Sequence, residues 1–294
     1  MAHSVPFVSG ETKVVGVFGF PVEHSLSPAM HNAAFAALQI PYIYVPFPVS
    51  PQALGPAIQS LSSLGIVGVN LTIPHKEAVL PFLTEITPEA REVGAVNTVH
   101  CREGALLGDN TDGQGFYTPL QEMGVDLAGK QVVVLGAGGA ARAVVFRLAR
   151  AGAQILVINR TPERAERLVQ AVAQAGYRDA ARILNTNRPE ALSAAIAGAT
   201  LLVQTTRVGM VPQEEALPDL PLDALSPHLL VYDLVYNPIE TRLLREARMR
   251  GCRTLTGVKM LVYQGAAAFQ RWTGIWPPTE VMEAAVLSAL TKST

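Results

Sequence analysis

Short apolar runs alternate with stretches of helical composition along most of the chain. Four consecutive apolar residues, 132–135, lead into a glycine-rich turn at 136–142 and then into a helical stretch, 143–150, which ends at Gly152. A second apolar run follows at 155–158. Strands buried on both faces of a parallel sheet have this continuous apolar character. The pattern therefore predicts a complete strand–helix–strand unit in the middle of the chain.

The same alternation occupies the first third of the chain. It predicts strands at 14–19, 42–47 and 66–70, helices at about 29–38 and 51–64, a further strand at 94–99, and a hairpin turn at 102–104. Strands that alternate with helices are typical of an open α/β sheet.

Beyond the central unit the pattern continues to the C-terminus. It predicts strands at 201–206, 229–235 and 254–255, and helices at 240–249, 257–272 and 280–290. Two α/β sheets are therefore expected, and the 294 residues have room for two domains or one large one.

The composition indicates which partners the protein can bind and which cellular compartment it occupies. The chain has 23 Lys and Arg against 24 Asp and Glu, so no basic face is implied and nucleic acid is not expected as a partner. Cys101 and Cys252 lack metal-ligand spacing, which argues for a reducing compartment and against a disulfide framework or a zinc site. The first 13 residues contain no apolar signal region, and no run is long enough to span a membrane. We expect a soluble, cytoplasmic protein.

The turn at 136–141 has the spacing G-x-G-x-x-A. Glycine allows a pyrophosphate to approach the backbone, and the helix that follows offers N–H groups and partial positive charge. A tight turn between a strand and a helix also favours glycine for structural reasons alone. Because the strand and the helix are both present, the turn predicts a bound dinucleotide.

The end of the second strand indicates which dinucleotide. NAD sites usually carry an acid there to bind the ribose hydroxyls. This chain has Asn159, Arg160 and Thr161, with Arg164 four residues after the first arginine. Two arginines can bind a 2′-phosphate, which an acid would repel. Thr161 and Pro162 also form a good N-cap pair, which could orient the arginines, so NADP is favoured over NAD.

Polar residues gather at the start of the first predicted helix. Ser27 and Pro28 make a good N-cap and first-turn pair, so Ser27 needs no ligand to explain it. Ser25 has no such structural explanation. Together the two hydroxyls could form a neutral cradle for a carboxylate.

A second polar cluster follows the strand at 66–70. Lys76 lies in the first turn of a short predicted helix, where the helix dipole disfavours a cation, and Asn70 and Thr72 precede it. A surface lysine is the alternative, but the cluster favours a functional one. Asn97 is an unusual choice within an apolar strand unless it is paired. Asp112 either caps the next helix or pairs with Lys76.

The order of these motifs resembles that of the shikimate dehydrogenase family. The matching motifs span residues 14 to about 274 and are Ser25-x-Ser27-Pro28, Asn70-x-Thr72-x-Pro74-x-Lys76, Gly94-Ala95-Val96-Asn97-Thr98, Gly108-x-Asn110-Thr111-Asp112-Gly113, Gly136 to Arg142, Asn159-Arg160-Thr161, Asp233 to Pro238, and Gly257-x-x-Met260-Leu261-x-x-Gln264.

The resemblance implies a fold and an activity. It implies an N-terminal open α/β substrate domain, 1–113 plus about 258–294, and a Rossmann NADP domain, about 114–257, with a cleft between them. The expected reaction is the reversible reduction of 3-dehydroshikimate to shikimate with NADPH, in aromatic amino acid biosynthesis. A monomer and a homodimer are both compatible with the sequence, and no metal is needed.

The resemblance also implies roles for individual residues. Lys76 would be the acid and base, paired with Asp112. Substrate would be bound at the carboxylate by Ser25, Ser27 and Tyr236, and at the ring hydroxyls by Thr72, Asn97, Asp112 and Gln264. Cofactor would be bound by Gly136, Ala137, Gly138, Gly139, Ala140, Asn159, Arg160, Thr161, Arg164, Thr205, Leu234, Gly257 and Met260.

At three positions that would line the cofactor side of the site, the chain differs from the residues usual in the family. The chain has Gln204 where Asn is common, Arg207 where a small residue is common, and Lys259 where glycine is frequent. Two alternatives remain: a quinate/shikimate dehydrogenase with relaxed substrate and cofactor use, and a non-catalytic NADP-responsive binding protein. Lys76 and Asp112 argue against the second alternative. Ser rather than Thr at position 27, together with Arg160 and Arg164, argues against the first.

Overall fold

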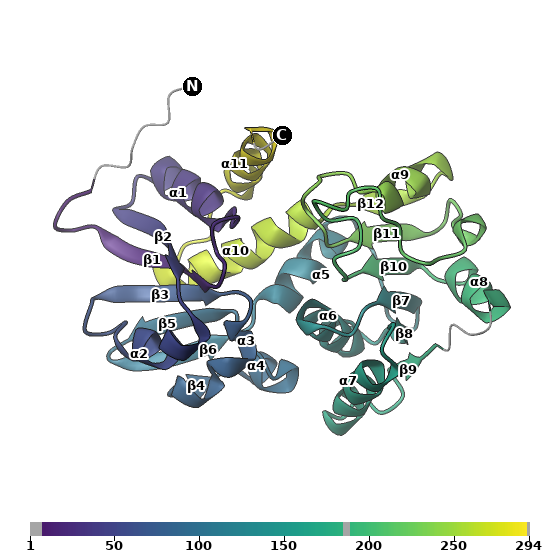
Figure 1. Cartoon of the computed structure of the whole chain (residues 1–294), viewed down its shortest axis with the longest axis horizontal. Helices are drawn as coiled ribbons and strands as arrows, with labels where there is room; N and C mark the ends of the chain where they lie inside the picture. The colour runs from purple at the N-terminus through teal and green to yellow at the C-terminus, as the bar shows by residue number, and fades with distance from the viewer. Residues whose placement is uncertain (1–7, 185–188, 293–294) are drawn as a thin grey trace. The chain divides into compact units, whose positions relative to one another are not determined.

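A computed structural model describes residues 8–184 and 189–292 of the chain. The chain divides into two compact units. Unit 1 comprises Met1–Thr111 and Val262–Thr294, and unit 2 comprises Asp112–Leu261. Within the described residues, each unit is built around a six-stranded sheet (Figure 1). The α/β fold in two units is confirmed, and the assignment of substrate and NADP to separate domains stays a prediction.

The sheet of unit 1 is mixed. Its strands are β1 (Lys13–Gly19), β2 (Tyr42–Pro48), β3 (Ile66–Leu71), β4 (Glu85–Ile86), β5 (Thr98–Arg102) and β6 (Ala105–Asp109). They lie in the order β2-β1-β3-β5-β6-β4. β1 is parallel to β2 and β3, whereas β5 is antiparallel to both β3 and β6. A tight hairpin at Glu103 and Gly104, which both have positive φ, of 52° and 82°, reverses the chain between β5 and β6.

Helices cover both faces of this sheet. They are α1 (Ser27–Leu38), α2 (Leu54–Gln59), α3 (His75–Ala78), α4 (Pro88–Val93), α11 (Thr279–Lys292) and the C-terminal part of α10 (Gly257–Thr273), with short 3₁₀ turns η1 (Pro51–Ala53) and η2 (Leu80–Phe82). Phe18 and Val99 pack on one face with Ile58 of α2. On the other face Tyr44 stacks on His31 of α1, with ring centroids 4.3 Å apart. Alternate residues of each strand therefore contribute to two apolar layers.

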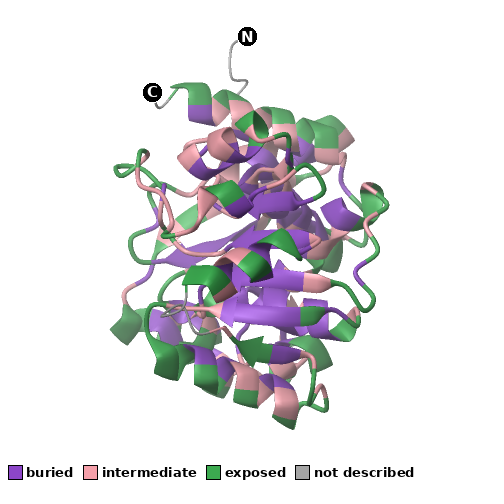
Figure 2. Ribbon diagram, turned by 90° about the vertical axis from the view of Figure 1, so that its right-hand side faces the viewer, coloured by how far each residue is buried: buried purple, intermediate pink, exposed green. Residues whose placement is uncertain are grey.

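In the sheet of unit 2, every pair of neighbouring strands is parallel. Its strands are β7 (Gln131–Leu135), β8 (Gln154–Ile158), β9 (Ala181–Ile183), β10 (Leu201–Gln204), β11 (Leu230–Asp233) and β12 (Arg253–Leu255), in the order β12-β11-β10-β7-β8-β9. The helices are α5 (Asp112–Glu122), α6 (Gly139–Arg150), α7 (Pro162–Gln174), α8 (Pro189–Ala197), α9 (Arg242–Met249) and the first part of α10, with a 3₁₀ turn η3 (Leu222–Ala224). Figure 2 shows the strands largely buried. The strand order reverses between β7 and β10, and ligands bind at such a switch point in doubly wound sheets.

Most predicted elements are confirmed, and the exceptions have local causes. The helix predicted at 51–64 ends at Gln59. Beyond it, the hydroxyls of Ser60 and Ser63 donate to backbone carbonyls three residues earlier, which competes with helical bonding. The strand predicted at 94–99 begins only at Thr98, because Val96 donates its N–H to Lys76 rather than to a neighbouring strand.

Besides the 3₁₀ turns, β4, α4, β9 and α8 escaped prediction. The strands β4 and β9 are two and three residues long, too short for a periodic signal. Across the described ranges, no helix is both long enough and apolar enough to cross a membrane.

Candidate active site

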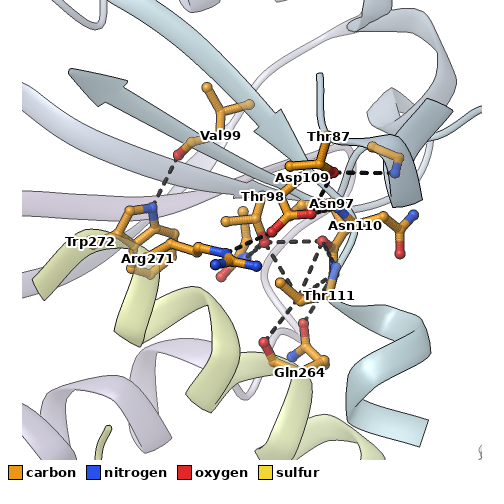
Figure 3. Close-up of polar contacts among 12 residues, drawn as sticks. Thr87, Asn97, Thr98, Val99, Asp109, Asn110, Thr111, Gln264, Arg271 and Trp272 are labelled. Carbon is orange, nitrogen blue, oxygen red and sulfur yellow. Dashed lines mark hydrogen bonds and ion pairs between the residues drawn. The ribbon is translucent and has the colours of Figure 1, made fainter. Parts of the chain in front are cut away.

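Asn97 is the centre of a buried polar network in unit 1 (Figure 3). Its Oδ1 accepts hydrogen bonds from the Thr111 N–H, at 2.8 Å, and from the Thr98 hydroxyl, at 3.0 Å. Its Nδ2 donates to Thr111 Oγ1, at 3.0 Å, and to Gln264 Oε1, at 3.4 Å. The backbone N–H of Thr111 needs an acceptor, which sets the orientation of the amide. The expected pairing of Asn97 is therefore present, and its contact with Gln264 is long for a hydrogen bond.

The network extends to the start of α1 through Tyr44 and Asn70. The Tyr44 hydroxyl donates to Asn70 Oδ1 at 2.8 Å, and Asn70 Nδ2 donates to Thr98 Oγ1 at 3.1 Å. The Ser27 side chain lies near the Tyr44 hydroxyl. Burial raises the pKa of Tyr44 well above its usual range, and the nearby Ser27 hydroxyl opposes that rise. The tyrosine is therefore a permanent donor, and it links Ser27 to the Asn97 network.

Sequence analysis missed Tyr44 because it lies in an apolar strand where an aromatic residue is ordinary. Asn70 was noticed only as a polar neighbour of Lys76, and Thr111 only as part of a motif. Their joint role depends on contacts between β2, β3, β5 and β6, which no local pattern reveals.

The expectation that Ser27 caps α1 is wrong. The helix begins at Ser27, with Leu26 at the N-cap position, and Ser25 Oγ accepts a hydrogen bond from the Ser27 N–H at 3.3 Å. Ser25 thus performs the local task that the sequence assigned to Ser27, and the Ser27 hydroxyl is free to reach Tyr44. The first turn of α1 contains no acidic residue. Its partial positive charge is therefore available to an anion.

Lys76 is the second residue of α3 and is half-buried. Its carbonyl oxygen accepts from the Val96 N–H at 2.8 Å, which fixes it next to Asn97 in unit 1. The preceding residue, His75, is buried, and its Nε2 lies 2.7 Å from the carbonyl oxygen of Val49. Thr72 lies in the same turn, and its carbonyl oxygen accepts from the His75 N–H at 2.9 Å. These contacts hold the backbone of the lysine.

Two predicted substrate residues belong to unit 2. Asp112 is the first residue of α5 and is 5% exposed, and Tyr236 follows β11 and is half-buried. Burial raises the pKa of Tyr236, so its hydroxyl stays protonated at neutral pH. The network of unit 1 unites Ser27, Asn97 and Gln264, whereas the pairing of Lys76 with Asp112 stays a prediction.

The glycine-rich turn between β7 and α6 has space that the protein itself does not fill. Gly136 has a φ of 111°, and a Cβ there would overlap Thr205 Oγ1, so the fold requires glycine. A Cβ on Gly138 or Gly139 would meet no atom within 4 Å, and the φ of Gly138 is an ordinary −89°. Both glycines are exposed at the N-terminus of α6, and the first turn of this helix contains no acidic residue. Packing does not explain them, whereas a pyrophosphate close to the backbone does.

The residues after β8 fit a phosphate. The side chains of Arg160 and Arg164 are exposed and, within the described residues, have no ion-pair partner. Asn159 Nδ2 donates to the carbonyl oxygen of Thr161 at 2.7 Å, which shapes the turn. Thr161 holds the expected N-cap position of α7, but its hydroxyl does not cap the helix. Thr161 is itself exposed in the same short segment as the two arginines.

The other predicted cofactor residues surround the ends of β10 and β11. Thr205 donates its hydroxyl to the Leu135 carbonyl oxygen at 2.6 Å. A Cβ on Gly257 would overlap the Leu234 carbonyl oxygen, so only glycine allows α10 to start there. Met260 is buried, which is what ordinary core packing predicts for a methionine. The remaining turn residues, Ala137 and Ala140, are partly exposed.

The three departures differ in environment. Gln204 is fully buried, and its Oε1 accepts from the Thr206 N–H at 3.1 Å, so it shapes the loop after β10. Arg207, in that loop, is exposed. Lys259 is half-buried on α10.

Asp233 is a buried carboxylate that sequence analysis noted only as part of a motif. Its Oδ2 accepts from the Thr241 hydroxyl at 2.6 Å, and its Oδ1 accepts from the Val235 N–H at 3.0 Å. Burial raises its pKa to about 6, although both hydrogen bonds oppose the rise. It holds the turn after β11, which carries Leu234 and Tyr236.

Comparisons with known proteins agree with this geometry. Family models match the chain in three segments: "Shikimate dehydrogenase substrate binding domain" at 17–99, "Shikimate / quinate 5-dehydrogenase" at 120–228, and "Shikimate 5'-dehydrogenase C-terminal domain" at 257–287. A shikimate dehydrogenase (NADP(+)) of Symbiobacterium thermophilum is 50% identical over 282 residues, which cover 96% of each chain. The chain belongs to the shikimate dehydrogenase family.

Solved structures of family members have the same fold. The shikimate 5-dehydrogenase of Thermus thermophilus, in complex with NADP(H) and shikimate, is 42% identical with a TM-score of 0.84, over 95% of this chain and all of that one. The quinate dehydrogenase of Corynebacterium glutamicum, in complex with NAD, is 33% identical with a TM-score of 0.86. The match covers 94% of this chain and 99% of that one. Members of one fold therefore differ in substrate and cofactor, and the choice depends on individual residues.

Proposed function

We propose that this protein is an NADP-dependent shikimate dehydrogenase, which catalyses the reversible reduction of 3-dehydroshikimate to shikimate in aromatic amino acid (chorismate) biosynthesis. The observation that carries the proposal is the buried network from Ser27 through Tyr44 and Asn70 to Asn97 and Gln264. It presents hydroxyl and amide groups, which suit a polyhydroxylated ring, beside the helix start that suits its carboxylate.

The substrate would be bound by unit 1 with help from unit 2. Ser25 and Ser27, at the acid-free start of α1, bind the carboxylate together with Tyr236. Thr72, Asp112 and the pair Asn97–Gln264 bind the ring hydroxyls. The Asn97–Gln264 contact, at 3.4 Å, is long for a hydrogen bond. A ring hydroxyl between the two amides would replace it with two shorter bonds.

Lys76 would be the acid in the reduction. NADPH supplies a hydride to the carbonyl carbon when it is bound, and negative charge then develops on the carbonyl oxygen. A protonated lysine stabilises that charge and donates the proton. Asp112 would pair with the lysine and hold its ammonium group at the carbonyl oxygen. In the reverse direction the same lysine accepts the proton from the hydroxyl of shikimate.

NADP would be bound by unit 2. The turn at Gly138 and Gly139 leaves open backbone for the pyrophosphate. Arg160 and Arg164, exposed and without ion-pair partners in the described part of the chain, would bind the 2′-phosphate. The two cysteines, Cys101 and Cys252, are free thiols, which supports the expected cytoplasmic location.

The alternative is a quinate/shikimate dehydrogenase with relaxed substrate and cofactor use. It is motivated by the resemblance to the quinate dehydrogenase, but the arginines at 160 and 164 favour NADP. The test is to measure NADPH oxidation with 3-dehydroshikimate, and NADP⁺ and NAD⁺ reduction with shikimate and with quinate. A kcat/KM for shikimate with NADP⁺ at least ten times that of each other pair supports the proposal. Equal use of quinate or NAD⁺ contradicts it, and no turnover at all indicates a binding protein.

A further inference from the structure

We infer that the ion pair between Asp109 and Arg271 positions Thr111, the hydrogen-bond partner of Asn97, against the predicted substrate residue Gln264, a role that rests on the proposed function. Asp109 is the last residue of β6 and only 7% exposed. Its Oδ2 accepts from Arg271 Nε at 2.7 Å. No family motif or predicted site residue accounts for this pair.

Each oxygen of the carboxylate has a partner from a different part of unit 1 (Figure 3). Oδ1 accepts from the Thr87 hydroxyl at 2.7 Å and from the Asn110 N–H at 2.8 Å. Thr87 caps α4, Asn110 begins the loop after β6, and Arg271 lies on α10. One buried charge thus joins three segments, and the arginine neutralises it.

The same loop is tied to α10 a second time. Thr111 donates its hydroxyl to the Gln264 carbonyl oxygen at 3.0 Å. Gln264 and Arg271 are seven residues apart, which is about two helical turns, so they lie on the same face of α10. The loop is thus bonded to α10 at both Asp109 and Thr111. We expect this double attachment to hold Thr111, and with it the Asn97 amide, in register with Gln264.

The pair is suited to position side chains rather than to hold the fold. Trp272, next to Arg271, donates its Nε1–H to the Val99 carbonyl oxygen at 3.0 Å and is buried. It anchors α10 on the sheet without the arginine. The Arg271 side chain is itself 52% exposed, so its loss leaves the apolar core unchanged.

The test compares Arg271→Met and Arg271→Lys with the wild type, measuring KM for shikimate, KM for NADP⁺ and the melting temperature. Arg250→Met is the matched control, because it removes a partly buried ion pair of 2.6 Å between Arg250 and Glu246 at the C-terminal end of α9 in unit 2. We expect Arg271→Met to raise KM for shikimate about tenfold, since small misplacements in a site are costly. KM for NADP⁺ should not change, and Arg271→Lys, which keeps a cation near Asp109, should recover most of the loss.

Asp109→Asn provides a second approach, because it retains acceptors for Thr87 and Asn110 while it removes the charge. It should raise KM for shikimate as Arg271→Met does. The inference is overturned if KM for shikimate stays unchanged, if both KM values rise together, or if Arg250→Met has the same effect. Calorimetric titration of each variant with shikimate distinguishes lost binding from lost folding. An inactive wild type would instead refute the proposed function.

Discussion

The hydroxyl of Tyr44 donates a hydrogen bond to Oδ1 of Asn70, 2.8 Å away, and both side chains are buried. The tyrosine ring is held in place by stacking on His31, with an angle of 2° between the ring planes. Burial lowers the pKa of His31 to about 3, so it remains a neutral aromatic partner. A rigid donor thus connects the start of α1 with the ends of β3 and β5.

Tyr44→Phe should weaken both folding and substrate binding. The change leaves Asn70 Oδ1 buried without its donor, which costs about 1–3 kcal/mol of the free energy of unfolding. Ser27 also loses a polar neighbour, so KM for shikimate should rise. Denaturant unfolding and steady-state kinetics measure the two effects. Tyr42→Phe on the same strand is the control, because its hydroxyl makes only a 3.4 Å contact with the Trp272 carbonyl oxygen. Equal effects of Tyr44→Phe and Tyr42→Phe would show that Tyr44 has no specific role in the site.

Lys76→Ala should reduce kcat about 100-fold or more, the range expected when a general acid is lost. Shikimate should still bind, because the serines and amides remain. Single-turnover kinetics and calorimetric titration separate the two steps. Lys130→Ala, at an exposed lysine, should leave kcat unchanged. A Lys76→Ala enzyme with near-normal kcat would show that another group transfers the proton.

Replacing both Arg160 and Arg164 by Gln should raise KM for NADP⁺ steeply and barely change KM for NAD⁺. Each charge-assisted contact with the phosphate contributes about 1.5–3 kcal/mol, so the preference for NADP should fall by about tenfold or more. In the wild type the preference should also shrink at high salt, because both arginines are exposed. Arg178→Gln, an exposed arginine beyond the C-terminal end of α7, is the control. Parallel loss with both cofactors would place the phosphate elsewhere.

Asp233 should make stability depend on pH in an unusual direction. Its pKa is about 6 in the folded protein against an ordinary value of 3.8, so ionisation destabilises the fold above about pH 6. As the pH falls through 6 towards 4, this cost of about 3 kcal/mol is lost. The free energy of unfolding of the wild type should therefore rise relative to Asp233→Asn over that range. Denaturant unfolding of both proteins at several pH values measures the difference, and a constant difference would contradict the raised pKa.

The elements and the nucleotide turn could be predicted from the sequence because their signals are local. The apolar run 132–135, the turn at Gly136 and the helix after it lie within about twenty residues, and each limits its own backbone. The arginines at 160 and 164 follow the next strand directly. Where the local signal was short or mixed, as at β4, β9 and the serine-rich end of α2, prediction failed.

The arrangement of the site was decided only by the tertiary structure. Ser25 and Ser27 exchanged their expected local roles because α1 begins one residue earlier than the cap signal indicates. Asn97 and Gln264 are 167 residues apart in sequence, and Asp109 and Arg271 are 162 apart. Local propensity constrains one residue at a time, whereas a buried polar group is stable only when a partner from another segment satisfies it. The sequence alone therefore determined which chemical groups the site contains, and the packing of β-strands against α10 determined which of them meet.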